Sequence, residues 1–355
     1  MTPLVLPNAP RVLVVALRRL GDVLLTTPLI HSIKRAYPSA SIEALVFAGT
    51  EGILSGNPDL SGVITLPQRP RPRETLALLW RLARRYDLAV TTQTGDRPTA
   101  IAVAAGRQSA GPIEAKGVAA SIKGFLLSRS FVREPGQHRV LEILRVADLL
   151  GIPAVTEIVC PQSSERPALI PSEPYAVIHA NPMFNYKRWT ADGWRKLAVV
   201  LRQRGLATVV TGAPSDRAYL ADVWNDSDVM RFDGKVSWPD LSSLIGSAQV
   251  YVGPDTAITH LAVATGVPAV ALFGPTDPRL WGPWPVGGLD PMWVAAGTIQ
   301  QRGNVWLVQN PQPCLPCQLE GCERRLDSYS RCLDELTVEQ VTVAVDQALA
   351  VSKAA

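Results

Sequence analysis

The sequence has no long run of apolar residues. None of its stretches approaches the roughly 18 consecutive apolar residues that a helix needs to cross a bilayer. The N-terminal segment M-T-P-L-V-L-P-N-A-P also lacks the basic start and apolar centre of a secretory signal. We therefore expect a cytoplasmic protein, and peripheral association with a membrane through its substrate stays open.

Several common catalytic and nucleotide-binding signatures are also missing. The chain contains no G-x-G-x-x-G, no G-x-x-x-x-G-K-[ST], no H-E-x-x-H and no G-x-S-x-G. A dehydrogenase or a serine hydrolase is therefore unexpected. The chain has four histidines, and no pair of them has metal-ligand spacing.

The composition is that of a globular protein with a mild basic excess. The chain has 355 residues, of which 47% are hydrophobic and 19% charged, and its formal net charge is +4. This length accommodates two domains with separate cores. The excess charge suits anionic substrates or an anionic membrane rather than a dedicated nucleic-acid binder. A solvated surface with surplus arginine explains it equally well.

The most informative stretch runs from residue 251 to residue 283. Its pattern predicts a strand, a helix capped at Asp255 or Thr256, and a second apolar strand over residues 269–273. Gly266 and Pro268 are suited to ending the helix. A helix that starts at the carboxyl edge of a parallel sheet presents unpaired N–H groups there, so the stretch indicates a site for a phosphate-bearing ligand.

Alternating strand and helix patterns fill both halves of the chain, separated by a Pro- and Ser-rich linker over residues 151–174. They predict an α/β protein with two doubly wound parallel sheets facing across a cleft. We expect an N-terminal acceptor-binding domain over 1–165 and a C-terminal nucleotide-sugar-binding domain over 166–335. A final helix over 336–355 could pack back on the N-terminal domain.

Three segments resemble a known family. They are L-R-R-L-G-D-V-L-L-T-T-P (17–28), G-P-D-T-A-I-T-H-L-A (253–262) and L-F-G-P-T-D-P-R-L-W-G-P (272–283). In order and spacing they are similar to the ADP-heptose:lipopolysaccharide heptosyltransferases of glycosyltransferase family 9. The resemblance implies two Rossmann-like domains in the GT-B arrangement and inverting, metal-independent sugar transfer.

The resemblance also implies roles for individual residues. Asp22 matches the general base of the family, and capping of a helix is its alternative role. Lys187 matches the lysine that neutralises the donor diphosphate, with Arg188 or a solvated surface lysine as alternatives. The implied donor-binding set is Gly21, Lys187, Arg188, Asp216, Asp255, Thr256, Ala257 and His260. Ala257 stands where the family usually has glycine. Alanine tolerates a helical backbone but not a positive φ. Packing alone would equally explain His260.

Arginines in the N-terminal half could bind a phosphorylated or carboxylate-bearing acceptor, because the guanidinium fork matches those anions. The candidates are Arg69, Arg71, Arg73, Arg97 and Arg107. A solvated basic loop is the alternative for residues 69–73.

Four cysteines near the C-terminus have plausible metal-ligand spacing. Cys314, Cys317, Cys322 and Cys332 could hold a structural Zn or Fe, remote from the chemistry, or could be reduced loop thiols. No cofactor is expected for catalysis.

We expect the protein to transfer heptose from ADP-heptose to a lipid-linked or core oligosaccharide of lipopolysaccharide. We expect this to happen at the surface of the inner membrane, and we expect no nucleic-acid partner. Three alternatives stay open: a protein (autotransporter) heptosyltransferase, a nucleotide-sugar epimerase of the same architecture, and a non-catalytic sugar-nucleotide-binding or assembly protein.

Overall fold

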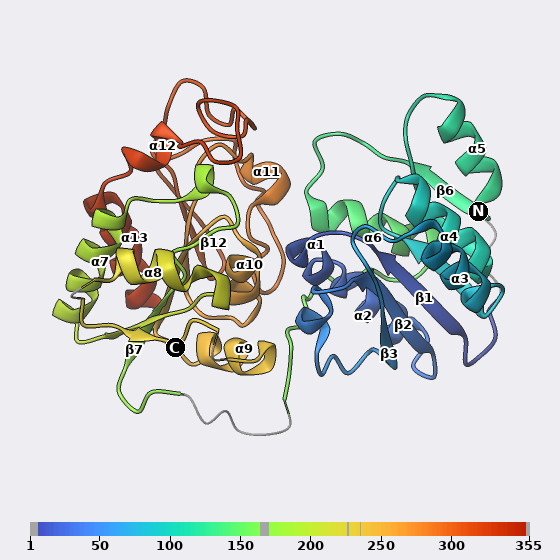
Figure 1. Cartoon of the computed structure of the whole chain (residues 1–355), viewed down its shortest axis with the longest axis horizontal. Coiled ribbons are helices and arrows are strands. Elements are labelled where there is room, and N and C mark those ends of the chain that lie inside the picture. Colours follow the sequence, from blue (N-terminus) through green and yellow to red (C-terminus); the bar gives the residue numbers. More distant parts are fainter. Residues whose placement is uncertain (1–5, 164–169, 226, 235, 353–355) are drawn as a thin grey trace. The chain divides into compact units, whose positions relative to one another are not determined.

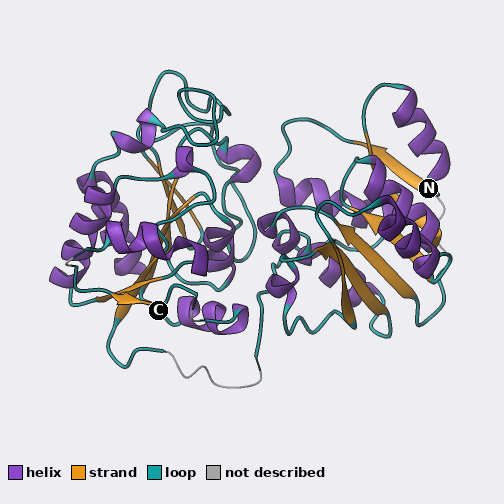
Figure 2. Cartoon of the chain, in the orientation of Figure 1, coloured by secondary structure: helices purple, strands orange, loops and turns teal. Residues whose placement is uncertain are grey.

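The computed structural model describes residues 6–163, 170–225, 227–234 and 236–352. The chain divides into two compact units, Met1–Pro161 and Gln162–Ala355. Each unit is built around one sheet whose strands are mostly parallel (Figure 1, Figure 2). The predicted α/β class with two parallel sheets is confirmed.

The N-terminal unit contains a six-stranded parallel sheet in the order β3-β2-β1-β4-β5-β6. Its strands are β1 (Arg11–Ala16), β2 (Ser41–Phe47), β3 (Gly62–Leu66), β4 (Tyr86–Thr91), β5 (Gly106–Ile113) and β6 (Arg129–Val132). Its helices are α1 (Leu20–Leu24), α2 (Thr27–Ala36), η1 (Glu51–Leu54), α3 (Pro72–Leu82), α4 (Asp96–Ala105), α5 (Val118–Leu126) and α6 (Arg139–Leu150).

Strand β1 forms the centre of this unit because both of its neighbours are parallel strands. Val12 lies opposite Ile42 of β2 on one side and Leu88 of β4 on the other, and all three side chains are fully buried. Helices therefore cover both faces of the sheet. Helix α2 contacts α6, whereas α3 and α5 both contact α4 on the opposite face (Figure 1). Right-handed crossovers require this division.

Strand β5 was not predicted from the sequence. Its segment G-R-Q-S-A-G-P-I is poor in the β-branched and aromatic residues that mark strands. The structure shows why small residues stand there. A Cβ added at Gly111 would lie 2.4 Å from Cγ2 of Thr91 on β4, so only glycine permits this approach of the two strands.

The C-terminal unit contains a seven-stranded sheet in the order β12-β13-β11-β10-β7-β8-β9, in which only the β12–β13 pair is antiparallel. Its strands are β7 (Tyr175–Ile178), β8 (Ala207–Val210), β9 (Met230–Arg231), β10 (Val250–Pro254), β11 (Ala269–Leu272), β12 (Ile299–Arg302) and β13 (Val305–Val308). Its helices are η2 (Asn185–Lys187), α7 (Ala191–Gln203), η3 (Pro214–Asp216), α8 (Arg217–Val223), α9 (Trp238–Gly246), α10 (Ala257–Ala264), α11 (Pro278–Trp281), α12 (Arg331–Asp334) and α13 (Val338–Ser352).

The stretch over residues 251–283 folds as its sequence predicts. Strand β10 leads into α10, and β11 returns parallel to β10 with Tyr251 opposite Ala269. Gly266 has a φ of +88°, the left-handed conformation expected at the end of this helix. The N-terminus of α10 therefore lies at the carboxyl edge of the sheet.

The last helix, α13, differs from its prediction. It packs against α7, β10, β11 and β13, and its apolar side chains belong to the core of the C-terminal unit. It is therefore part of that unit rather than a separate segment. None of the helices in the described ranges is long and apolar enough to cross a membrane.

The linker expected over residues 151–174 coincides with the division between the units. Its residues 151–163 and 170–174 form neither helix nor strand. Residues 164–169 lie outside the described residues.

Candidate functional site

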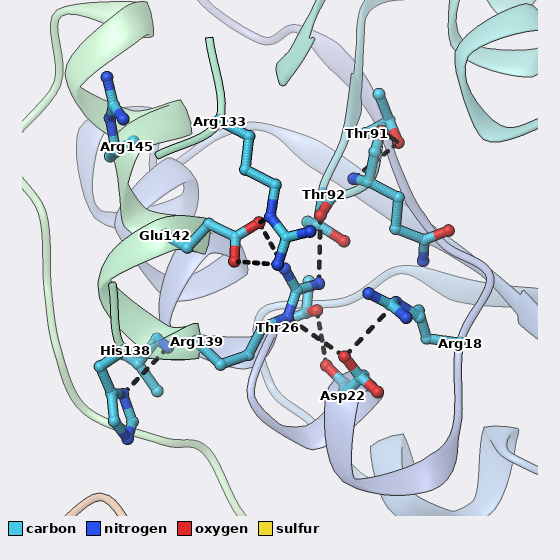
Figure 3. Close-up of polar contacts among 12 residues, drawn as sticks. Arg18, Asp22, Thr26, Thr91, Thr92, Arg133, His138, Arg139, Glu142 and Arg145 are labelled. Atoms are coloured by element: carbon cyan, nitrogen blue, oxygen red, sulfur yellow. Dashed lines mark hydrogen bonds and ion pairs between the residues drawn. The ribbon is translucent and has the colours of Figure 1, made fainter. Parts of the chain in front are cut away.

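Asp22 occupies the first turn of α1, which follows the carboxyl end of β1. Its Oδ1 accepts a hydrogen bond of 3.1 Å from Nε of Arg139 and lies 3.6 Å from Nε of Arg18 (Figure 3). Both contacts use the same carboxylate oxygen. Among the described residues, Oδ2 has no such partner, so it remains available to a ligand.

Arg139 is the side chain that fixes this carboxylate, and it is only 2% exposed. Its Nη2 donates a 3.1 Å hydrogen bond to the carbonyl of Thr92, and its Nη1 lies 3.1 Å from Oε1 of Glu142. Burial lowers the pKa of Arg139, and the charges of Asp22 and Glu142 oppose that shift. The guanidinium is thus held by three elements, and its orientation determines that of Asp22.

Glu142 connects this group to a third arginine. Its Oε1 lies 2.8 Å from Nε of Arg133, so Glu142 is shared between two guanidinium groups (Figure 3). Three arginines therefore surround two carboxylates, and the cluster carries one net positive charge at neutral pH. A surplus of positive charge beside Asp22 favours a ligand that carries anionic groups.

Neither Arg139 nor Glu142 was predicted from the sequence. They lie three residues apart on the helix α6. Both point to the buried side of that helix, together with Ile143 and Val146. A charged pair at i, i+3 on the apolar face was the signal that could have marked them, because such residues are seldom buried without a partner.

The C-terminal unit presents a second polar group at the carboxyl edge of its sheet. Lys187 ends η2, and its Nζ lies 2.5 Å from Oδ2 of Asp255, the residue that follows β10. Burial favours the neutral form of Asp255, but Lys187 and a hydrogen bond from Thr276 outweigh it, so the pKa of Asp255 lies below its ordinary value. The predicted pair of Lys187 and Asp255 is thus brought together as an ion pair.

Helix α10 begins beside this pair. Thr256 is its N-cap, and Oγ1 of Thr256 accepts a 3.3 Å hydrogen bond from the N–H of Thr259. Ala257 is the first helical residue and does not have a positive φ. Alanine in place of glycine therefore keeps the backbone of the first turn intact. His260 is buried one turn further, and its charge would help to hold Asp255 ionised.

Other predicted donor residues have different surroundings. Arg188 points away from Asp255: its Nε donates to Oδ1 of Asn181 at 3.0 Å, and its guanidinium stacks on the ring of Tyr219 at 4.1 Å. Asp216 closes η3 by accepting a 2.8 Å hydrogen bond from the N–H of Ala213. Gly21 lies in α1, where its carbonyl accepts from the N–H of Leu25.

The predicted acceptor arginines lie on loops and first turns after strand ends. Arg69 and Arg71 follow β3, Arg73 is in the first turn of α3, and Arg97 is in the first turn of α4. These four side chains are exposed. Arg107 on β5 is also exposed and lies 3.9 Å from Asp87.

The four C-terminal cysteines lie in and before α12. Across the described part of the chain, no group of three or more His, Cys, Asp or Glu side chains is arranged to hold a metal ion. Cys332 is buried in α12, whereas Cys314 and Cys322 are exposed in the preceding loop. Burial and the neighbouring thiols of Cys317, Cys322 and Cys314 raise the pKa of Cys332 to about 12. The predicted Zn or Fe site is therefore not supported.

Comparison with known proteins agrees with this geometry. The family "Glycosyltransferase family 9 (heptosyltransferase)" matches residues 76–287. Lipopolysaccharide heptosyltransferase 3 of Escherichia coli is 30% identical over 287 residues, which cover 74% of this chain and 83% of that protein. Lipopolysaccharide heptosyltransferase 1 of Pseudomonas aeruginosa is 25% identical over 345 residues, covering 93% of this chain and 92% of that protein.

The fold has solved counterparts as well. The structure of the E. coli heptosyltransferase WaaC with ADP matches with a TM-score of 0.71 and 21% identity, covering 95% of this chain and 99% of that one. The two α/β units, each built on a mostly parallel sheet, have the GT-B fold, and the matching family makes the chain a glycosyltransferase. Within that class, the chain belongs to glycosyltransferase family 9, the heptosyltransferase family.

The ion pair of Lys187 and Asp255 makes a prediction for stability. In the wild type the pKa of Asp255 is lowered, so the ionised carboxylate stabilises the folded protein. This stabilisation is present above the pKa that Asp255 has in the unfolded chain, and it is lost as the pH falls through the lower pKa of the folded protein. In Lys187→Met, burial dominates and raises the pKa of Asp255. The unfolding free energy should then fall as the pH rises, to about 2 kcal/mol below the wild type near neutral pH.

Urea denaturation at mildly acidic and neutral pH measures this difference. The double variant Lys187→Met/Asp255→Asn removes the unpaired charge, and we expect it to recover most of the loss and to abolish the added pH dependence. A Lys187→Met protein as stable as the wild type at neutral pH would show that the pair does not compensate a buried charge.

Proposed function

We propose that the chain transfers heptose from ADP-heptose to an inner-core sugar of lipopolysaccharide, with inversion at the anomeric carbon and without a metal ion. The family membership and the names of the similar proteins support the donor and the class of acceptor. The observation that carries the proposal is the Asp22 carboxylate: the buried Arg139 holds one oxygen, and the other has no side-chain partner among the described residues.

In this proposal Asp22 is the general base. Its Oδ2 accepts the proton of the acceptor hydroxyl while that oxygen attacks the anomeric carbon of the donor. The contact with Arg139 fixes the direction of the carboxylate, so no reorientation is needed as the proton moves. Such a base contributes roughly 10²–10⁴ to the rate.

The donor diphosphate binds in the C-terminal unit. The N–H groups of the first turn of α10, after Thr256, and the ammonium group of Lys187 converge at one edge of the sheet. They suit a diphosphate that gains charge as the bond to the sugar breaks. Asp255 balances Lys187 before ADP-heptose arrives, and His260 lies close enough to contribute to the same field.

The acceptor binds in the N-terminal unit, next to its base. The exposed Arg69, Arg71, Arg73 and Arg97 follow the carboxyl ends of β3 and β4, the edge of the sheet from which Asp22 also projects. Guanidinium groups at this edge suit the phosphate and carboxylate groups of a lipid-linked inner core. The proposed partner is therefore a lipid-linked or core oligosaccharide at the surface of the inner membrane.

The variant Asp22→Asn tests the role of the base. It keeps the size of the side chain but cannot take the proton, so we expect kcat to fall by at least about 10² with ADP affinity unchanged. Lys187→Met should instead weaken ADP binding by roughly tenfold, because it removes a cation from the diphosphate. Calorimetry with ADP and turnover assays distinguish the two. Turnover by Asp22→Asn within a few-fold of the wild type would rule out the base.

The variant Arg139→Lys tests whether the buried guanidinium positions Asp22. Lysine lacks the planar fork whose separate Nε, Nη1 and Nη2 atoms contact Asp22, Glu142 and the carbonyl of Thr92, so we expect kcat to fall by about tenfold or more while KM changes little. The matched control is Arg145→Lys on the same helix, which pairs with the exposed Glu134. Equal kcat in the two variants, with both proteins folded by circular dichroism, would contradict a positioning role.

A further inference from the structure

Helix α5 presents its apolar residues outward. Val118, Ile122, Phe125 and Leu126 are all exposed, and Phe125 is 88% exposed. Val118 and Leu126 each lie four residues from Ile122, and Phe125 lies three residues from it, so the four share one face of the helix. The usual arrangement on a surface helix is the reverse, with the apolar face against the sheet.

The inward face of α5 contains the only charged residue of the helix. Lys123 is 7% exposed, and its Nζ lies 2.8 Å from Oδ1 of Asp96 and 2.9 Å from Oε1 of Glu114. It also donates a 2.6 Å hydrogen bond to the carbonyl of Thr94. Burial alone would lower the pKa of Lys123, but the two carboxylates outweigh it and the pKa is raised. These contacts fix the rotation of α5, so its apolar face is held outward.

A second helix on the same side of the sheet has a similar exposed pair. Helix α3 exposes Leu76 and Trp80, one turn apart, and Trp80 is 83% exposed. Both α3 and α5 contact α4, and the three helices cover the face of the sheet opposite α2 and α6 (Figure 1). We call the exposed side chains of this layer the outer apolar face; they are Leu76, Trp80, Val118, Ile122, Phe125 and Leu126.

The exposed charges around this face are mostly positive. Beside α5, Lys116 and Arg133 are exposed and basic, Asp96 and Glu134 are exposed and acidic, and the buried Lys123 is neutralised by Asp96 and Glu114. Next to α3 the exposed basic residues are Arg69, Arg71, Arg73 and Arg81. The nearby Glu74 caps the first turn of α3, where its Oε2 accepts a hydrogen bond from the N–H of Arg71. The rim of the outer apolar face is therefore mostly basic.

We propose that the outer apolar face docks on an anionic lipid bilayer. Apolar side chains with a basic rim are what a helix needs to lie in the headgroup region, and tryptophan prefers that depth. Two copies of the chain would bring like charges together, whereas an anionic lipid surface complements them. The inference rests on the proposed function in one respect, since docking would bring the enzyme to a lipid-linked acceptor.

Vesicle binding tests the proposal without donor or acceptor. The full chain is sedimented with vesicles of phosphatidylglycerol and phosphatidylethanolamine, and with vesicles of phosphatidylcholine alone. We expect binding to the anionic vesicles that weakens with added salt. The double variant Ile122→Gln/Phe125→Gln should bind roughly tenfold more weakly, and Lys116→Glu/Arg81→Glu should lose most of its preference for anionic lipid.

The matched control is Val199→Gln, which replaces an exposed apolar residue on α7 of the other unit and should bind as the wild type does. Equal vesicle binding by the wild type and Ile122→Gln/Phe125→Gln would overturn the proposal. A second result would also overturn it: the wild type does not bind vesicles, and analytical ultracentrifugation shows a dimer for the wild type but a monomer for the double variant.

Turnover of a detergent-dispersed acceptor separates this proposal from the proposed function. The double variant should retain wild-type turnover there, because the outer apolar face lies outside the residues proposed for the chemistry. Inactive wild type that still binds anionic vesicles would count against heptosyl transfer but not against docking.

Discussion

The contact between the buried Arg139 and Asp22 is the interaction on which the N-terminal site depends. A guanidinium that is 2% exposed needs acceptors for all its edges, and Asp22, Glu142 and the carbonyl of Thr92 provide them. These groups come from α1, α6 and the end of β4, so the charge can be buried only when three elements are in place. The same requirement holds the carboxylate of Asp22 in one orientation.

In the C-terminal unit a buried charge is also compensated by an opposite charge, here in the single ion pair of Asp255 and Lys187. Asp255 is buried at the start of α10, and Lys187 compensates its charge from a short helix in a different part of the chain. The pair differs from the arginine cluster because Lys187 is partly exposed and its ammonium group is mobile on a flexible stem. A ligand phosphate can therefore compete with Asp255 for Lys187, whereas Asp22 and Arg139 stay together.

The sequence predicted the parts of the site that are local in the chain. The strand–helix–strand unit around α10, the cap at Thr256 and the turn at Asp22 all follow from short patterns whose geometry is set within a few residues. Arg139 was missed because its hydrogen bond to Asp22 joins residues 117 positions apart. Strand β5 was missed because it is rich in small residues, which have low strand propensity. These residues are needed there because β4 lies very close. The four-cysteine spacing predicted a metal site, and among the described residues no group of side chains supports it.

Analysis of the reaction product tests the central claim most directly. The enzyme is incubated with ADP-heptose and a heptose-free inner-core acceptor, and the product is examined by mass spectrometry and by NMR of the new anomeric centre. The account predicts that one heptose is added for each ADP released, with an anomeric configuration opposite to that of the donor. A product with the configuration retained, or ADP release without any added heptose, would contradict it.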